Sequence, residues 1–461
     1  MKKHILNILL ILAATGGGPA FGQSSISEIS GLASDSSIIR YWKADKSVIY
    51  TSNGSGNNYF LLADQSTGMV RRITVPANVT VNDFRILHDT VFAGGYFNNA
   101  GTKQGLLACF NINDFNNSGG NYHWAVAQQS AMPDCYDGCC QNQIDEITRI
   151  ALYDTSNNDS TEIAFIAKNH IVGETTMRVG IGHARFNGTT WNRMFIYNKY
   201  AVEEYTDIIA TSQYVAAVGK SNDSARLVMR IFPKYDFIVP TCPLPNYCYY
   251  HNMYGQGMKD LTVCTDVMAT ALDNDDFAVA YHFYGPYTKG LALKTFSISS
   301  SLASLTQAIN IESTKTPSPM WKMRDIRYSP LMRRIAVLND YNGGGMASNV
   351  SVIYQFHATP LTAGTYHGHY LSGHKLFSMD CNTANPHSYI CSGIGSGDTR
   401  FFDEFFSTSA SCGTTDAVKA GLTSDAIYAT FMQTNTNEPL FNWGTTAFVT
   451  DIINRDIICA K

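Results

Sequence analysis

Short apolar runs separated by polar turns recur along the whole chain. Six of them share one form, in which a polar residue and an aspartate precede an apolar stretch, at residues 81–87, 144–150, 205–211, 264–270, 323–329 and 414–420. Runs of this length, rich in β-branched and aromatic side chains and bounded by Gly, Asn and Asp, are typical of β-strands. The pattern therefore predicts an all-β chain.

The runs belong to a longer repeat. The first five of these aspartates follow one another at intervals of about 60 residues. After a turn comes a second apolar run, such as 90–95 or 213–219, and then a third, such as 105–111 or 226–232. A further unit at residues 38–74 has four such runs without the aspartate. Repeated units of this kind predict a single β-propeller, because each blade has two apolar faces that only its neighbours can cover.

The number of blades is less strongly indicated than the fold. We expect seven four-stranded antiparallel blades, with eight as the alternative, because the last two aspartates lie farther apart than the others. The segment 375–406 between them is either an irregular blade or an insertion. Terminal strands at 26–30 and 446–452 are available to close the ring, which would hide exposed sheet edges. A row of β-sandwich domains is the competing fold, but it would lack the long repeat.

Two units resemble kelch repeats. In residues 91–96 a Gly94-Gly95 pair ends the second strand, and Trp124 follows the next one; residues 186–191, which end in Trp191, are similar to the tail of the same pattern. The resemblance covers two of the expected seven units. It implies a propeller fold and no particular activity.

The amino-acid composition limits the classes of protein and of binding partner that we expect. The 461 residues are 45% hydrophobic and 15% charged, with 33 basic and 37 acidic side chains. This balance excludes a disordered or coiled-coil protein. A weakly acidic chain also gives no electrostatic reason to expect nucleic acid or an anionic membrane as partner. We expect a monomer.

The N-terminus predicts export. Lys2 and Lys3 precede an apolar run at 5–14, and small residues at Ala20 and Gly22 indicate cleavage near Gly22. This is the pattern of a secretory signal peptide, so residues 1–22 are expected to be removed and 23–461 to form the mature domain. No other stretch is long and apolar enough for a membrane span. The mature protein is expected to be secreted or periplasmic, as exported bacterial propellers are.

The 11 cysteines are compatible with disulfides in an exported protein. Their close groupings favour disulfide bonds between cysteines that are near one another in the sequence. An odd total leaves at least one thiol free. Connectivity stays open. The groupings are Cys135/Cys139/Cys140, Cys242/Cys248 and Cys381/Cys391.

The repeated aspartates are the first candidate site. In a propeller the first strand of each blade lines the central channel, so six carboxylates are expected near one mouth; they are Asp83, Asp145, Asp207, Asp266, Asp325 and Asp416. They either hold a structural cation or act as repeat anchors that accept backbone N–H bonds. Arg85 and Arg327 lie two residues after their aspartates and Arg149 lies four after, so internal neutralisation favours the anchor role.

Long segments between repeats are the second candidate. Residues 115–143, 239–261, 299–321 and 358–374 are expected to be loops that emerge on one face of the ring. The second of them is dense in aromatic side chains that could stack on sugars or bind a protein. The ligand-binding candidates are Tyr247, Tyr249, Tyr250, His251 and Tyr254. Aromatic side chains packed over a blade edge are the alternative.

Signals for catalysis are weak. His367 and His369 could chelate a transition metal, but uncommitted histidines are the commoner outcome, and we predict no cofactor. The sequence has no Gly-x-Ser-x-Gly elbow, phosphate-binding loop or dinucleotide fingerprint. We therefore expect a non-catalytic propeller that binds a glycan, peptide or protein. The alternative is an extracellular carbohydrate-active hydrolase or lyase with carboxylates from several blades at the channel mouth.

Overall fold

The structure is a computed structural model of the full chain. It describes residues 36–433 apart from 44–45, 53–57, 65–68, 117–124, 127–141, 155–159, 172–175, 198–202, 222–225, 235–246, 253–262, 285–288, 300–301, 314–321, 331–332, 341–349, 359–365, 373–374, 382–387, 395–399, 408–414 and 424–425.

The described residues form seven antiparallel sheets, numbered here in chain order. Sheet 1 contains β1 (Ser36–Lys43), β2 (Lys46–Ser52), β3 (Asn58–Asp64) and β4 (Met69–Val75). Sheet 2 contains β5 (Val79–Leu87), β6 (Thr90–Asn99), β7 (Thr102–Asn111) and β8 (Ala125–Val126), with the 3-10 helix η1 (Ile112–Asn116) after β7. Sheet 3 contains β9 (Asn142–Asp154), β10 (Thr161–Ile171), β11 (Arg178–Phe186) and β12 (Trp191–Tyr197).

The second half of the chain continues the same order. Sheet 4 contains β13 (Glu203–Ala210), β14 (Tyr214–Ser221), β15 (Arg226–Pro233) and β16 (Tyr247–Asn252). Sheet 5 contains β17 (Val263–Ala271), β18 (Phe277–Tyr284), β19 (Lys289–Ser299) and β20 (Leu302–Ser313). Sheet 6 contains β21 (Met323–Ser329), β22 (Arg334–Asp340), β23 (Val350–His357) and β24 (Tyr366–Ser372). Sheet 7 has five strands, β25 (Lys375–Cys381), β26 (Ser388–Ile394), β27 (Arg400–Ser407), β28 (Thr415–Thr423) and β29 (Ala426–Gln433).

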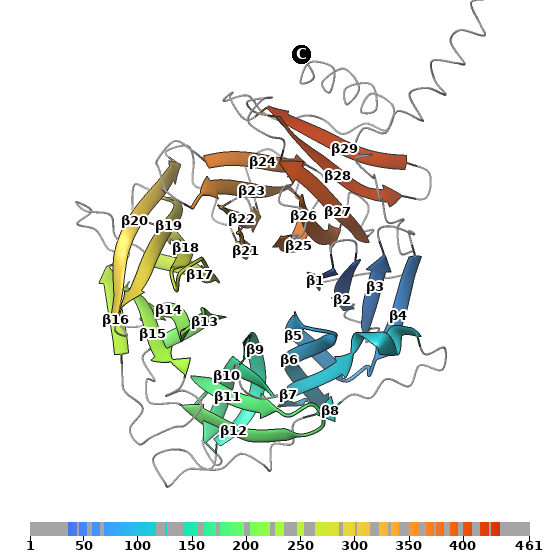
Figure 1. The fold of residues 1–461 in the computed structure, drawn as a ribbon, viewed down its shortest axis with the longest axis vertical. Helices are drawn as coiled ribbons and strands as arrows, with labels where there is room; N and C mark the ends of the chain where they lie inside the picture. The colour runs from blue at the N-terminus through green and yellow to red at the C-terminus, as the bar shows by residue number, and fades with distance from the viewer. Residues whose placement is uncertain are drawn as a thin grey trace, which may run out of the picture.

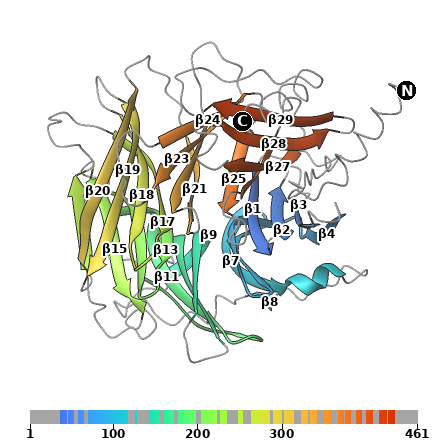
Figure 2. The same ribbon diagram turned by 45° about the horizontal axis from the view of Figure 1, so that its top comes forward.

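The sheets are arranged radially around one axis (Figure 1). The first strand of each sheet lies innermost and the later strands lie progressively farther out, as both views show (Figures 1 and 2). Within each sheet every strand pairs with the next one along the chain. This is the architecture of a β-propeller.

The second strands show why the sheets need neighbours. Five consecutive residues of β6, β14 and β22 are buried, so both faces of these strands are covered. Continuous apolar runs, rather than alternating ones, are typical of strands that are buried on both sides. Each sheet therefore depends on the sheets beside it for stability.

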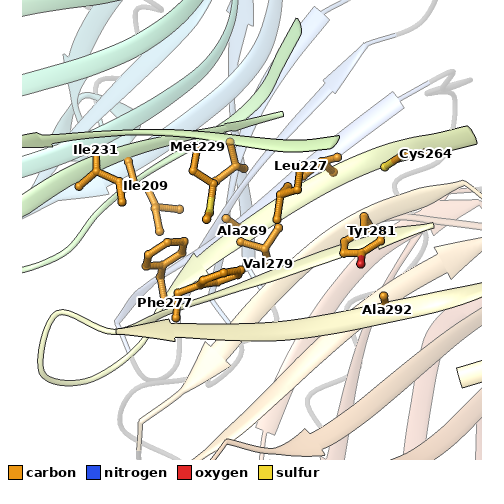
Figure 3. Packing of buried hydrophobic residues seen from close by; sticks show 14 of the residues in the cluster. Ile209, Leu227, Met229, Ile231, Cys264, Ala269, Phe277, Val279, Tyr281 and Ala292 are labelled. Atoms are coloured by element: carbon orange, nitrogen blue, oxygen red, sulfur yellow. The ribbon is translucent and has the colours of Figure 1, made fainter. Parts of the chain in front are cut away.

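The hydrophobic core lies between neighbouring sheets. Between sheets 4 and 5, Met229 and Ile231 of β15 pack against Phe277 and Val279 of β18 (Figure 3). Burial of a side chain of this size contributes roughly 1.5–3 kcal/mol. Similar clusters lie between sheets 1 and 2, 2 and 3, 3 and 4, and 5 and 6. Stacking of sheets is therefore the main apolar contribution to the fold.

Two glycines occupy equivalent places on second strands. Gly95 pairs with Val81, and Gly219 pairs with Tyr205, in each case one residue before a register shift in the first strand. A Cβ atom at Gly95 would collide with the carbonyl oxygen of Thr80, and one at Gly219 with that of Glu204. The first strand approaches the second too closely here for any side chain.

The predicted long loops differ from the structure. Each of the four segments contains the fourth strand of its sheet; these strands are β8, β16, β20 and β24. Most of the residues that flank these strands lie outside the described part of the chain. The expectation that these segments are loops throughout is therefore wrong, and the expectation that their remaining residues gather on one face stays a prediction.

Several expectations concern residues outside the described part of the chain. They include the signal peptide at 1–22, the closing strands at 26–30 and 446–452, Trp124, Tyr254, and the cysteines at 135, 139, 140 and 242. Among the described residues, no helix has the length and apolar character that a membrane span requires.

Candidate functional site at the axis of the ring

The first strands of sheets 2, 4, 6 and 7 bulge at a shared position. Their pairing with the second strand skips Asn82, Thr206, Arg324 and Phe377. A β-bulge re-aims the side chains beside it. The residue that follows the bulge, and points toward the next sheet, is Asp83, Asp207, Asp325 or Ser378.

Asp83 joins sheet 2 to sheet 3. Its carboxylate accepts a hydrogen bond of 3.2 Å from the backbone N–H of Ile150 on β9. Arg85, two residues further along β5, donates from Nε to the carbonyl oxygen of Ile150 at 3.2 Å. The two side chains thus hold both backbone polar groups of one residue, an arrangement that we call a backbone clamp.

A second backbone clamp joins sheet 6 to sheet 7. Asp325 accepts a hydrogen bond of 3.1 Å from the N–H of Met379, and Arg327 Nε donates to the carbonyl oxygen of Met379 at 3.1 Å. The hydroxyl of Ser378 also donates to Asp325, at 2.9 Å. A hydrogen bond to a charged group contributes about 1.5–3 kcal/mol. The clamps therefore add polar connections to boundaries between sheets.

Sheet 4 has the aspartate without the arginine. Asp207 accepts a hydrogen bond of 2.9 Å from the N–H of Ala269 on β17. Ile209 stands where a clamp has its arginine. The guanidinium of Arg149, from β9, lies with Nε 3.9 Å from the Asp207 carboxylate. This boundary is held by the carboxylate and by apolar packing.

Arg40 of β1 connects three other sheets. Its Nη2 lies 3.1 Å from Asp83 of sheet 2, and its Nη1 lies 3.4 Å from Asp325 of sheet 6. Nη1 also donates to the hydroxyl of Ser378 of sheet 7 at 3.0 Å. The side chain is buried. A single guanidinium therefore joins carboxylates from opposite sides of β1 near the axis.

The carboxylates near the axis differ in pKa. Burial acts to raise the pKa of Asp83 and of Asp325, but the neighbouring arginines outweigh it and hold both below the ordinary value. Burial raises the pKa of Asp207, because Arg149 and the Ala269 N–H offset it only in part. Burial and the nearby Arg327 lower the pKa of Arg40 to about 10, which leaves it charged at neutral pH.

Two other predicted anchors are themselves the extra residue of a bulge. Asp145 is skipped in the pairing of β9 with β10, and its carboxylate lies 2.7 Å from Nδ1 of His170. Asp266 is skipped in the pairing of β17 with β18, has a φ of 51°, and accepts a hydrogen bond of 3.3 Å from the N–H of Met323. In sheet 3 the residue after the corresponding bulge is Arg149.

Asp416 does not lie on a first strand. It belongs to β28, the fourth strand of sheet 7, where it pairs with Ser407 and Met432. The first strand of that sheet is β25, and Ser378 takes the place of the aspartate there, accepting a bond of 3.3 Å from the N–H of Ile39. A serine hydroxyl performs the same acceptor role, which is why a search for repeated aspartates missed it.

The aromatic and histidine candidates lie far from the axis. Tyr247, Tyr249, Tyr250 and His251 belong to β16, the outermost strand of sheet 4 (Figure 1). His367 and His369 belong to β24, the outermost strand of sheet 6. In the described part of the chain, no three His, Cys, Asp or Glu side chains are grouped to hold a metal ion.

The described cysteines do not form the predicted staple. Cys381 is a buried free thiol, so a Cys381–Cys391 bridge is absent from the structure. Cys109 is also a buried free thiol, and burial raises its pKa to about 12. Cys248 lies on β16, while Cys242 is outside the described residues. These two thiols and a third buried free thiol, Cys264, are shielded from reagents in water.

Comparisons with known proteins concern the fold. No protein-family model and no curated protein matches the chain. The β-propeller domain of the Trilobed protease from Pyrococcus furiosus is similar over 80% of this chain and 97% of its own, with 7% identity and a TM-score of 0.39. Sqt1 from Chaetomium thermophilum covers 86% of this chain and 83% of its own, with 11% identity and a TM-score of 0.45.

A further similar structure is the Nup133 β-propeller domain from Vanderwaltozyma polyspora. It covers 82% of this chain and 95% of its own, with 7% identity and a TM-score of 0.43. At identities and TM-scores this low, these similarities indicate no activity or partner. The resemblance to kelch repeats stays a prediction, since no family model supports it.

Proposed function

We propose that the chain is an exported, non-catalytic seven-bladed propeller, a single domain over residues 23–461, that binds a glycan, peptide or protein partner. The observation that carries this proposal is the pair of backbone clamps. Asp83 and Asp325 each accept a backbone N–H from the next sheet and pair with arginines. A carboxylate that exchanged protons with a substrate would give up these bonds, so the clamps favour a structural role.

Direct contact of the first and last sheets supports a ring of seven blades. Sheet 1 bonds to sheet 7 through Ser37 and Ser392, whose hydroxyls lie 2.8 Å apart. The N–H of Tyr41 also donates to Asp380 at 2.8 Å. A direct connection between β1 and β25 favours seven blades over eight.

Binding and turnover can be separated with one purified preparation. We expect the mature protein to bind at least one member of a glycan or peptide array and to release no product from a panel of chromogenic glycosides. N-terminal sequencing of the exported protein should begin at Gln23 if the signal peptide is cleaved as proposed. Failure to bind any array member would contradict the proposal.

A carbohydrate-active hydrolase or lyase is the second candidate, favoured by Asp145 and His170. A carboxylate that hydrogen-bonds one imidazole nitrogen can orient the ring for proton transfer at the other. The His170 side chain is partly exposed, so the second nitrogen can be reached from water. Glycoside turnover that is lost in His170→Gln and retained in Lys168→Gln would establish this candidate over the first.

A further inference from the structure

We propose that the axis of the ring binds the carboxylate group of an acidic ligand through the guanidinium groups of Arg85 and Arg149. The inference rests on the proposed binding function and names the ligand chemistry and the residues. It concerns the innermost strands rather than the aromatic residues of β16.

The two arginines share one part of the axis. Arg85 lies on β5 and Arg149 on β9, the first strands of neighbouring sheets. Arg85 Nε donates to the carbonyl oxygen of Ile150, the residue directly after Arg149. Both guanidinium groups also lower the pKa of the Asp207 carboxylate. The two side chains therefore extend from neighbouring positions on adjacent first strands.

Exposure distinguishes the cations from their anionic partners. The side chains of Arg85 and Arg149 are 24% and 29% exposed, whereas those of Asp83 and Asp207 are 3% and 8% exposed. The carboxylates are turned toward backbone N–H groups of the next sheet and away from water. An incoming ligand at this point thus meets guanidinium groups first.

Both guanidinium groups keep donors available. Arg85 uses Nε for Ile150 and Nη2 for Asp83, and Arg149 uses Nη1 for the carbonyl oxygen of Thr148. Within the described residues, Arg85 Nη1 and Arg149 Nη2 have no acceptor. A guanidinium presents five N–H groups in a planar fork that matches a carboxylate. The geometry therefore suits a carboxylate better than a neutral hydroxyl.

The internal partner of Arg149 is weak. Its Nε lies 3.9 Å from Asp207, beyond hydrogen-bond distance. Arg85, by contrast, belongs to a backbone clamp. A ligand carboxylate would therefore gain most of its interaction from Arg149, with Arg85 as the second donor.

Calorimetric titration tests the proposal. The probes are trigalacturonate and triglutamate, which carry carboxylates on a sugar and on a peptide, with neutral galactotriose as the matched control. We expect the wild-type protein to bind at least one acidic probe at low salt and to bind the neutral sugar more weakly. Arg149→Gln should weaken binding of the acidic probe at least about 10-fold, since a hydrogen bond to a charged group is lost.

Two further variants make the result specific. Arg149→Lys keeps the charge without the planar fork, so we expect an intermediate loss. Lys103→Gln removes an exposed charge of sheet 2 and should leave binding unchanged. Thermal unfolding of each variant confirms that the fold is retained.

The outcomes also separate this inference from the proposed function. Equal losses in Arg149→Gln and Lys103→Gln, equal binding of the neutral sugar, or no binding of either acidic probe would overturn the carboxylate site. If array binding then persists in Arg149→Gln, the binding function stands and lies elsewhere on the molecule. Loss of all array binding in the wild-type protein would remove the proposed function itself.

Discussion

The carboxylate of Asp325 accepts a hydrogen bond from the backbone nitrogen of Met379 across the boundary between sheets 6 and 7. The same carboxylate receives Arg327 and Arg40 and is almost completely buried. Removing its charge would leave two buried guanidinium groups with weaker partners. This one residue therefore connects sheets 1, 6 and 7. We expect its substitution to weaken the contacts among all three sheets.

We expect Asp325→Asn to lower the free energy of unfolding by about 3 kcal/mol, because it breaks a buried ion pair and places an amide donor among donors. Urea denaturation at pH 7 measures the difference. Asp276→Asn is the matched control, since the Asp276 side chain has no hydrogen bond or ion pair among the described residues. Equal losses of unfolding free energy in the two variants would show that the backbone clamp at Asp325 does not stabilise the fold.

The contribution of Asp325 to the free energy of unfolding should disappear in acid. Its pKa in the folded protein lies below the ordinary value of 3.8, because Arg327 and Arg40 outweigh burial. A lowered pKa gives stability that is complete above 3.8 and is lost as the pH falls through the folded pKa. The difference between wild type and Asp325→Asn should therefore stay constant from pH 6 to about pH 4 and shrink as the pH falls further toward pH 3. A difference that stays constant down to pH 3 would contradict the assigned charge state.

Lys294 should destabilise the folded protein at neutral pH. Its side chain is buried over the ring of Tyr281, and burial lowers its pKa from 10.5 to about 8. Between these values the unfolded chain binds more protons, so the free energy of unfolding rises with pH. Lys294→Met should therefore be more stable than wild type at pH 7, by up to about 3 kcal/mol.

The advantage of Lys294→Met should decrease as the pH rises from 8 toward 10.5, which unfolding at several pH values would show. Lys168→Met offers the control, because it removes a lysine charge from an exposed position rather than a buried one. An advantage that is independent of pH would assign the effect to packing rather than to charge.

Gly219 should tolerate no side chain. Gly219→Ala places a Cβ against the carbonyl oxygen of Glu204, a backbone atom that cannot move without disturbing the bulge before Asp207. We expect a loss of about 3 kcal/mol, measured by thermal unfolding. Gly188→Ala is the control: it meets no neighbouring atom, and its cost is limited to about 1 kcal/mol from the positive φ.

The repeat in the sequence was sufficient to predict the propeller. Its period follows from a physical requirement, since every sheet must cover the next and so carries the same buried runs. The sequence pattern indicates the fourth run of the 38–74 unit, but it predicts loops where the structure has the fourth strands β8, β16, β20 and β24. The segment Tyr366–Ser372, with its Gly and two His, resembles a loop in sequence but forms β24.

The candidate site could be predicted only in part. Asp83, Asp207 and Asp325 repeat along the chain, so their shared position was visible. Arg40 gave no such signal, because its partners lie in sheets 2, 6 and 7 and are brought to it only by ring formation. The exposure that singles out Arg149 likewise depends on how neighbouring sheets pack. A residue whose role occurs only once in the structure, as that of Arg40 does, leaves no repeated signal in the sequence.

The bond between Ser37 and Ser392 joins residues that are 355 positions apart. Every other pair of neighbouring sheets is formed by adjacent stretches of the chain, so those contacts can form while synthesis continues. Closing a loop of this length costs conformational entropy and is slow. In the proposed seven-bladed ring, we therefore expect the junction of sheets 1 and 7 to assemble last. An incomplete ring, with the apolar face of sheet 1 still uncovered, would be the intermediate most exposed to aggregation.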